Sequence, residues 1–262
     1  MQGLGNDYIY LNCLDHIPED LPGLARRLSD RHFGVGGDGL ICICPSRTAD
    51  FRMRMFNADG SEGRMCGNGI RCVGKFVYDR GLTGRTALDI ETPAGVRRLA
   101  LRTEGGAVTA VTVDMGAPGL EAPVPIQVNG KTYTGRPVDM GNPHLVVYWD
   151  RLETLPIASL GPGFEACPHF PHGVNTEFVR VDGRSRLTMR VWERGSGETL
   201  ACGTGACAAA VCAAADGLTE GDVTVRLPGG ELSIRWGGGD AHVYMTGPAV
   251  TVFEGEISIC NA

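Results

Sequence analysis

The sequence lacks a surplus of basic residues, a long hydrophobic run and a cluster of closely spaced cysteines. Lys and Arg number 24 against 30 Asp and Glu, which leaves a net charge of −6. A phosphate-binding face needs concentrated positive charge, so we do not expect nucleic acid as a partner. The longest wholly apolar stretch, Ala206–Ala215, is too short to span a bilayer, so we expect no membrane partner.

The 10 cysteines include no C-x-x-C pair, a common element of structural zinc sites. Cys42 and Cys44 lie in an alternating apolar run, where both side chains would point into a core. The first residues also lack the basic region and apolar core of a secretory signal. We therefore expect reduced thiols in a cytoplasmic protein with no bound metal. Cys13, Cys167 and Cys260 are expected to be ordinary buried or half-buried residues.

Two glycine-rich stretches resemble nucleotide-binding motifs, but their context argues against that function. Gly34–Gly39 reads G-x-G-x-x-G, yet it follows a predicted helix and leads into a strand. The dinucleotide fingerprint instead follows a strand and opens a helix, so we interpret this stretch as a turn. Gly69–Phe76 is one residue short of a P-loop, and Phe76 has no hydroxyl group for magnesium. We expect no nucleotide cofactor.

The strongest positive signal is a Cys-Gly-x-Gly turn that occurs at Met65–Gly69 and again at Ala201–Gly205. Each turn follows an apolar run typical of a strand and begins a predicted helix. The two cysteines, Cys66 and Cys202, are 136 positions apart (202 − 66), about half of the 262 residues. This spacing predicts a repeat.

The same offset recurs elsewhere in the chain. It relates Gly5-Asn6 to Gly141-Asn142, and nine residues before the two cysteines stand Asn57 and Glu193. We therefore expect two copies of one structural unit, each contributing a cysteine. The boundary is expected at Gly116–Gly119, where Gly and Pro gather, so that residues 1–117 with about 249–262 form one half and 118–248 the other.

Hydrophobic periodicity predicts similar elements in both halves. The first half is expected to contain strands Tyr8–Leu11, Leu40–Cys44, Ala87–Glu91, Val96–Arg102 and Val108–Asp114, with helices Leu21–Arg31 and from Cys66 to about Arg80. The second is expected to contain strands Ile126–Val128, Thr132–Val138, Leu145–Trp149, Glu177–Val181, Leu187–Trp192, Val223–Leu227, Glu231–Trp236 and Ala241–Met245, with helices near Ala158–Cys167 and after Cys202. A final strand is expected to begin at Thr251–Phe253. The helix after Cys202 is apolar on every face, which predicts that strands surround it closely.

A cysteine in the first turn of a helix is placed for acid–base chemistry. Free backbone N–H groups and the positive helix end stabilise a thiolate, which predicts a pKa lowered toward neutrality. The same groups can bind a carboxylate. Two such helix ends facing one cavity would hold a carboxylate between two thiols, ready to remove a proton from one face of a carbon and return one to the other. We expect this role for Cys66 and Cys202, and a structural role for Cys72, Cys207 and Cys212.

Five motifs together resemble the diaminopimelate epimerase family over nearly the full length. They are Gly3–Asp7, Phe56–Ser61, Met65–Gly69, Gly141–His144 and Glu193–Gly205. The resemblance implies an α/β fold of α+β type, with two pseudo-symmetric halves that each wrap a curled mixed β-sheet around a central buried helix. It also implies an active site in the cleft between the halves, no cofactor, diaminopimelate as a small-molecule substrate and a homodimer.

The resemblance also assigns roles to individual residues. Cys66 and Cys202 fall at the catalytic positions, and His144 and Glu193 where the family tunes the pKa values of the cysteines. The substrate-contact positions are Asn6, Asn57, Gly67, Asn68, Asn142, Asn175, Glu193, Arg194, Gly203 and Thr204. Two residues depart from the pattern: Gln2 stands where many members have His, and Gly39 where some have a Gln that touches substrate.

The main alternative is another cofactor-independent amino-acid racemase on the same scaffold. Proline-type enzymes are expected to have Met-Cys-Gly-His-Gly, whereas this chain has Asn68. A histidine racemase would differ only in its distal pocket. Arg194 together with Asn57 and Asn175 favours a distal carboxylate and amine. A non-catalytic relative or an isomerase that lacks the thiols is disfavoured by the presence of both cysteines.

Overall fold

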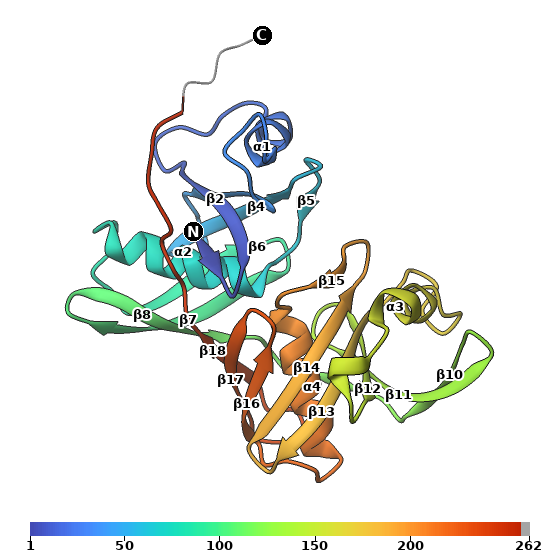
Figure 1. The fold of residues 1–262 in the computed structure, drawn as a ribbon. Helices are drawn as coiled ribbons and strands as arrows, with labels where there is room; N and C mark the ends of the chain where they lie inside the picture. Colours follow the sequence, from blue (N-terminus) through green and yellow to red (C-terminus); the bar gives the residue numbers. More distant parts are fainter. Residues whose placement is uncertain (258–262) are drawn as a thin grey trace.

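The computed structural model describes residues 1–257. The N-terminal half contains β1 (Gln2–Gly3), β2 (Asn6–Asn12), α1 (Leu21–Ser29), β3 (Gly39–Cys44), β4 (Phe51–Asn57), β5 (Glu62–Gly63), α2 (Gly67–Asp79), β6 (Ala87–Thr92), β7 (Gly95–Glu104) and β8 (Ala107–Asp114). In Figure 1 this half runs from blue to green, and the end of the chain returns across it. Cys260 lies outside the described residues.

The C-terminal half repeats this order. It contains β9 (Gly119–Leu120), β10 (Val124–Val128), β11 (Lys131–Asp139), β12 (Pro143–Tyr148), a short 3-10 helix (Leu152–Thr154), α3 (Ile157–Glu165), β13 (Asn175–Gly183), β14 (Arg186–Glu193), β15 (Gly197–Thr199), α4 (Gly203–Ala215), β16 (Asp222–Leu227), β17 (Gly230–Trp236) and β18 (Val243–Gly247). Of the described helices, none is both long and apolar enough to cross a bilayer.

The structure confirms the internal repeat. The helix pair α1 and α3 and the helix pair α2 and α4 are each related by the offset that separates the two cysteines. The strand registers agree as well: β2 and β3 pair in parallel with Tyr8 opposite Gly39, and β12 and β13 pair in parallel with His144 opposite Asn175. The fold is therefore a mixed α/β structure built from two pseudo-symmetric halves.

The two halves are joined where β8 pairs antiparallel with β18. Thr112 lies opposite Thr246 in this ladder, and their hydroxyl oxygens are 2.8 Å apart. Because each strand is the last of its half, the pairing places the halves about an approximate two-fold axis that passes between β8 and β18. The same axis brings the two thiol-bearing helices together.

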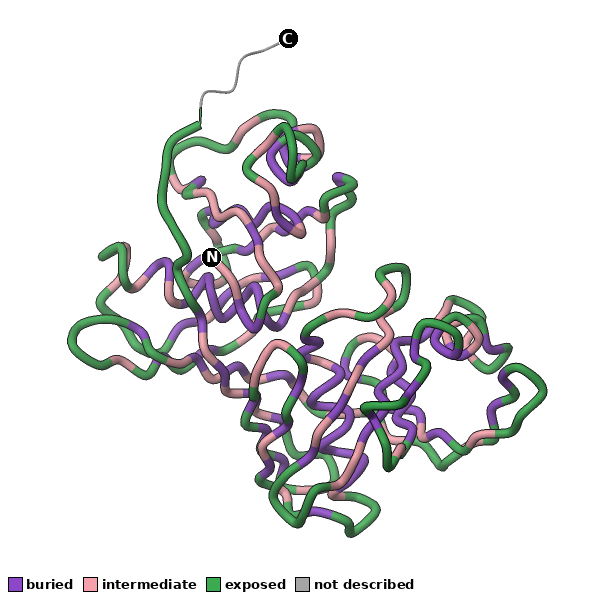
Figure 2. Tube along the Cα trace, in the orientation of Figure 1, coloured by how far each residue is buried: buried purple, intermediate pink, exposed green. Residues whose placement is uncertain are grey.

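Each half wraps its sheet around one helix. In the N-terminal half α2 packs against β7 and β8, and in the C-terminal half α4 packs against β12, β13 and β17. All residues of α4 from Gly203 to Ala213 are buried except Thr204, as predicted from its apolar composition. Small Ala and Cys side chains let the strands approach this helix closely. Figure 2 shows the buried segments running through both helices and the strands around them.

Three sequence-based expectations need correction. No strand forms over residues 251–257; Val250 makes one bridge to Gln2, and Val252 and Phe253 stay 62% and 64% exposed. Helix α1 stops at Ser29 because Asp30 turns out of the helix and its carboxylate accepts the next free N–H groups. Helix α3 spans Ile157–Glu165, one residue earlier at its start and two at its end than expected.

Two further expectations are confirmed. The Gly34–Gly39 stretch is a turn, in which the N–H groups of Gly34 and Gly36 satisfy free carbonyl oxygens at the end of α1. Cys42 and Cys44 are both buried beneath that helix, together with Cys13. Cys167 is buried as well, in a separate cluster under α3.

Candidate active site

The first residues of α2 and α4 touch each other. A Cβ atom placed on Gly67 would lie 3.7 Å from the Cα of Gly203, and one placed on Gly203 would lie 3.6 Å from the Cα of Gly67. The Sδ of Met245 packs under the contact, 3.0 Å from the Cβ that Gly203 lacks. Glycine suits this contact because a side chain on Gly203 would require Met245 to shift. Since Cys66 and Cys202 directly precede these glycines, the contact brings two thiol-bearing helix ends together.

Cys66 is the N-cap residue of α2. Its sulfur accepts the backbone N–H of Gly69 at 3.2 Å, and its S–H donates to Oδ1 of Asn6 at 3.2 Å. Burial raises the pKa of this thiol to about 11, although the Gly69 N–H group opposes the shift. The expectation of a pKa lowered toward neutrality is therefore wrong for the empty site. The helix end does favour the thiolate, but desolvation outweighs it.

Cys202 is the N-cap residue of α4 and is only 5% exposed. Its sulfur lies 3.5 Å from the hydroxyl oxygen of Thr204. Burial raises the pKa of the Cys202 thiol well above its usual range, and the carboxylates of Glu193 and Glu177 raise it further. The same correction applies here, because burial and the neighbouring carboxylates both oppose the thiolate.

Glu193 is electrostatically coupled to both thiols. Its negative charge raises the pKa of Cys66 and that of Cys202. The hydroxyl group of Thr199 donates to its Oε1 at 2.5 Å, which ties the end of β14 to β15. Tyr8, which the sequence did not single out, belongs to the same group: burial and the neighbouring Cys66 raise the pKa of its phenol.

His144 and Glu177 form a pair inside the C-terminal half, and both are fully buried. Nδ1 of His144 lies 2.7 Å from Oε1 of Glu177, and Nε2 lies 3.2 Å from Oδ1 of Asn142. Burial raises the pKa of the Glu177 carboxyl, while the neighbouring His144 opposes that shift. Sequence reasoning missed Glu177. The available signal was the internal repeat, which places the acidic Glu177 at the position of the apolar Ile41.

The predicted contact residues on the N-terminal side belong to two small networks. Asn6 donates its amide to Asp38 at 2.8 Å, which aims the Asn6 carbonyl oxygen at Cys66. Asn57, half-buried at the end of β4, donates to the hydroxyl of Ser61 at 3.0 Å. The structure thus brings Asn6 to the thiol, whereas the side chain of Asn57, the last residue of β4, is bonded to the loop that follows its strand.

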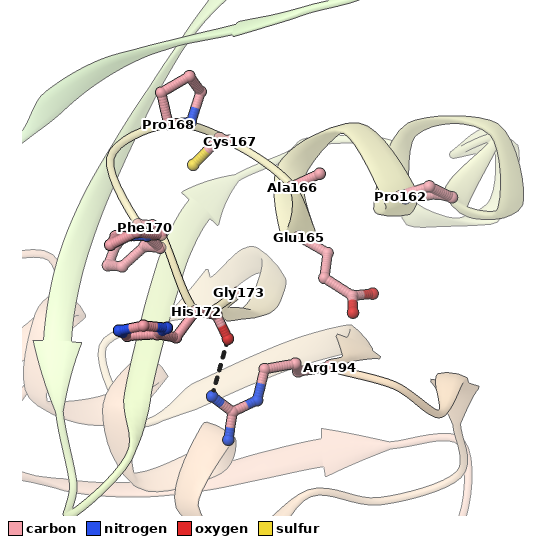
Figure 3. Close-up of a pocket in the computed structure, with 10 residues that line it drawn as sticks. Pro162, Glu165, Ala166, Cys167, Pro168, Phe170, His172, Gly173 and Arg194 are labelled. Carbon is pink, nitrogen blue, oxygen red and sulfur yellow. Dashed lines mark hydrogen bonds between the residues drawn. The ribbon is translucent and has the colours of Figure 1, made fainter.

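On the C-terminal side Asn175 supports the turn that carries Arg194. The side-chain oxygen of Asn175 accepts the backbone N–H of Arg194 at 2.9 Å. The Arg194 guanidinium is exposed and donates to the carbonyl oxygen of His172 at 3.0 Å. Figure 3 shows it at the edge of a hollow of about 640 Å³ between the end of α3 and the 166–173 segment. Arg194 therefore lies on the rim of this hollow, held by Asn175 and His172.

Asn68 links the two halves. It is 3% exposed, and its amide donates to the carbonyl oxygen of Ala201, the residue before Cys202, at 3.0 Å. Of the predicted residues, Cys66, Cys202, Asn6, Glu193, Gly67, Gly203, Asn68 and Thr204 meet around the two helix ends. Within residues 1–257, no group of three or more His, Cys, Asp or Glu side chains is arranged to hold a metal ion.

Solved structures share this architecture. A phenazine biosynthesis protein of the PhzF family from Bacillus anthracis superposes with a TM-score of 0.76, covering 99% of this chain and 95% of that one at 18% identity. A probable proline racemase from Agrobacterium radiobacter, with bound carbonate, superposes with a TM-score of 0.72, covering 96% and 90% at 18% identity. At this identity the likeness establishes the fold alone.

Relatives in sequence are far more similar. A diaminopimelate epimerase from Acetivibrio thermocellus is 51% identical, covering 99% of this chain and 97% of the relative. One from Desulfovibrio desulfuricans is 50% identical with the same coverage. The family model for diaminopimelate epimerase matches residues 1–121 and 137–252, which include both thiol-bearing helix ends. The chain belongs to the diaminopimelate epimerase family.

Proposed function

We propose that this protein is a cofactor-independent isomerase that interconverts LL- and meso-diaminopimelate, a step on the route to lysine and peptidoglycan precursors. Membership of the family supports the reaction. The observation that supports the two-thiol chemistry is the contact between Gly67 and Gly203, each of which directly follows a cysteine. Cys66 and Cys202 would act on opposite faces of one α-carbon.

Proton transfer requires one thiolate and one thiol. Burial raises the pKa of both thiols, so the charge of the substrate itself has to favour the thiolate. An amino acid carries an α-ammonium group, and a positive charge close to the sulfurs lowers a thiol pKa. One sulfur then takes the α-proton, and the other gives its own proton to the opposite face of the carbanion. Glu193 and His144 are the residues that we propose tune the two pKa values.

The binding residues suit a substrate with an amino-acid group at each end. Free N–H groups in the first turns of α2 and α4 (Gly67, Asn68, Gly203 and Thr204) suit the carboxylate at the reacting centre. Asn6 and Asn142 would contact the same end. At the other end Arg194 would make a two-pronged contact with the distal carboxylate, and Asn57 and Asn175 would lie beside it.

We extend the proposal to the molecular setting. The two functional halves would be residues 1–117 with about 249–262 and residues 118–248, with the active site between them. We propose a cytoplasmic homodimer; the cysteines of the described residues are all unpaired, which suits a reducing compartment. Exposed Val252 and Phe253 offer apolar surface for self-association. Light scattering coupled to gel filtration would measure the oligomeric state directly.

The decisive experiment follows α-deuterium incorporation by NMR in deuterium oxide, starting separately from each isomer. Cys66→Ala and Cys202→Ala should each abolish net epimerisation, while each surviving thiol slowly exchanges the α-proton of one isomer, and the two variants should prefer opposite isomers. Cys167→Ala, a buried cysteine under α3, serves as the control and should keep near wild-type turnover. Epimerisation near the wild-type rate by either single variant would refute the two-thiol assignment.

A further inference from the structure

The two halves differ at the positions behind their thiols. Under the internal repeat, His144 occupies the position of Tyr8, since the two residues have the same place in the parallel pairs β12–β13 and β2–β3. Glu177 likewise occupies the position of Ile41. Glu177 lies two residues after Asn175, the strand partner of His144, and Ile41 lies two residues after Gly39, the strand partner of Tyr8. The C-terminal half therefore has an imidazole and a carboxylate where the N-terminal half has a phenol and an alkyl group.

The two equivalent side chains contact the helices in the same way. A Cβ atom on Gly69, in the first turn of α2, would lie 2.6 Å from Cδ1 of Ile41. A Cβ atom on Gly205, in the first turn of α4, would lie 2.5 Å from Oε1 of Glu177. The glycines leave space for a side chain to press against the helix end that holds the thiol. On the C-terminal side this space is filled by a carboxyl group.

The Glu177 carboxylate has few partners. Oε1 is bonded to His144, and Oε2 is buried without a hydrogen-bond partner among the described residues. A buried carboxylate is costly unless it is paired, so an apolar side chain such as that of Ile41 would serve packing better. The arrangement is therefore unfavourable as simple core packing and needs a different explanation.

The hydrogen-bond partners of His144 restrict where its ring protons lie. A carboxylate oxygen at 2.7 Å from Nδ1 requires that this nitrogen carry the hydrogen, unless the carboxyl group itself is protonated. A carboxylate bonded to one ring nitrogen fixes both the orientation and the tautomer of an imidazole. Nε2 then faces Oδ1 of Asn142 at 3.2 Å, and because an amide oxygen only accepts, this contact is a hydrogen bond only when Nε2 carries a hydrogen as well.

We propose that Glu177 is a positioning residue for the Cys202 side of the reaction: its carboxylate holds the Nδ1–H of His144 and leaves Nε2 as the ring nitrogen available to the site. The inference rests on the proposed epimerase function. The His144–Glu177 pair gives the two thiols different surroundings, because Tyr8 and Ile41 stand at the equivalent positions behind Cys66. Proton transfer through Cys202 depends on Glu177, whereas transfer through Cys66 does not.

The test combines a spectroscopic and a kinetic measurement. In wild-type protein containing ¹⁵N-labelled histidine, the His144 resonances should show a proton on Nδ1, and Glu177→Gln should shift both ring-nitrogen resonances. The same variant should exchange the α-proton of the isomer assigned to Cys202 about tenfold or more slowly, with a much smaller effect on the isomer assigned to Cys66. Gln preserves the size of the side chain, so a packing effect is minimised.

Ile41→Val is the matched control, because it alters packing at the equivalent position in the other half. It should leave the His144 resonances and the ratio of the two exchange rates unchanged. A wild-type His144 with its proton only on Nε2 would overturn the proposal, and this outcome does not require that the variant fold. Equal loss of both exchange rates in Glu177→Gln, with unchanged His144 resonances, would also overturn it. If wild-type protein exchanged neither isomer, the proposed function would fail, while the resonances would still report on the Glu177–His144 bond.

Discussion

Asn68 in α2 donates a hydrogen bond to the carbonyl oxygen of Ala201, so the helix of one half is tied to the residue that precedes the thiol of the other. The bond is buried, and it lies beside the contact of the two helix ends. The relative position of the two sulfurs therefore depends on a small number of contacts that cross between the halves.

Asn68→Ala should destabilise the protein and slow epimerisation. The substitution leaves the buried Ala201 carbonyl without its partner, which costs about 1–3 kcal/mol of unfolding free energy. Urea denaturation and kcat/KM measured on the same preparation test both effects. Gln127→Ala, which removes an exposed hydrogen bond to Thr132, should change the unfolding free energy by less than about 0.5 kcal/mol. If the two substitutions changed the unfolding free energy equally, the hydrogen bond from Asn68 to Ala201 would have no special importance.

Gly203→Ala should be more damaging than its size suggests. The added methyl group would lie 3.0 Å from Sδ of Met245, so the Met245 side chain has to shift beneath the contact of the two helix ends. Overpacking of this kind costs about 1–3 kcal/mol, and the altered packing beside the thiol should lower kcat. Gly84→Ala meets no atom within 4 Å and is the control. Thermal unfolding measures the effect on stability, and initial rates measure the effect on kcat. A Gly203→Ala enzyme with wild-type kcat would show that the packing around the two helix ends is not critical for turnover.

Arg194→Lys should reduce kcat/KM for diaminopimelate about 10²-fold while the fold is preserved. Lys keeps the charge but loses the planar pair of donors, so the distal carboxylate is held less accurately. Steady-state kinetics and circular dichroism provide the measurement. The same exchange at Arg186, an exposed residue paired with Glu231, should have little effect. Retention of near-normal kcat/KM would remove Arg194 from the binding site.

Alkylation of Cys66 in the empty enzyme should depend steeply on pH. The thiolate is the reactive form, and the pKa of about 11 keeps the group protonated at neutral pH. The rate with iodoacetamide should therefore rise about tenfold per pH unit above pH 7 and level off only near pH 11, as followed by peptide mass spectrometry. Free glutathione provides the reference thiol. A plateau below pH 9 would mean that the helix end outweighs burial after all.

The parts of the site that follow from local sequence were predicted correctly. Cys66-Gly67 and Cys202-Gly203 mark helix starts because glycine and a capping residue act within one turn. The direction of the thiol pKa shifts was wrong, because it depends on burial by strands that are distant in sequence. Glu177 was missed for a related reason: only the pairing of β12 with β13 brings it to His144.

The end of the chain illustrates a different limit. Thr251–Phe253 has the apolar and β-branched character of a strand, but a strand needs a free sheet edge beside it. Val250 bridges to Gln2, but β1 spans only Gln2–Gly3, so this ladder does not continue along residues 251–257. Glu254 instead forms an exposed ion pair with Arg80.

The antiparallel ladder between β8 and β18 makes this molecule equivalent to a symmetric dimer whose two protomers have been fused into one chain. In a dimer of identical chains, a substitution behind one thiol would necessarily appear behind the other as well. Fusion removes that constraint, so Ile41 and Glu177 can occupy equivalent places and mutate independently. The substrate presents two chemically different faces, and a fused scaffold can adapt each half to one of them.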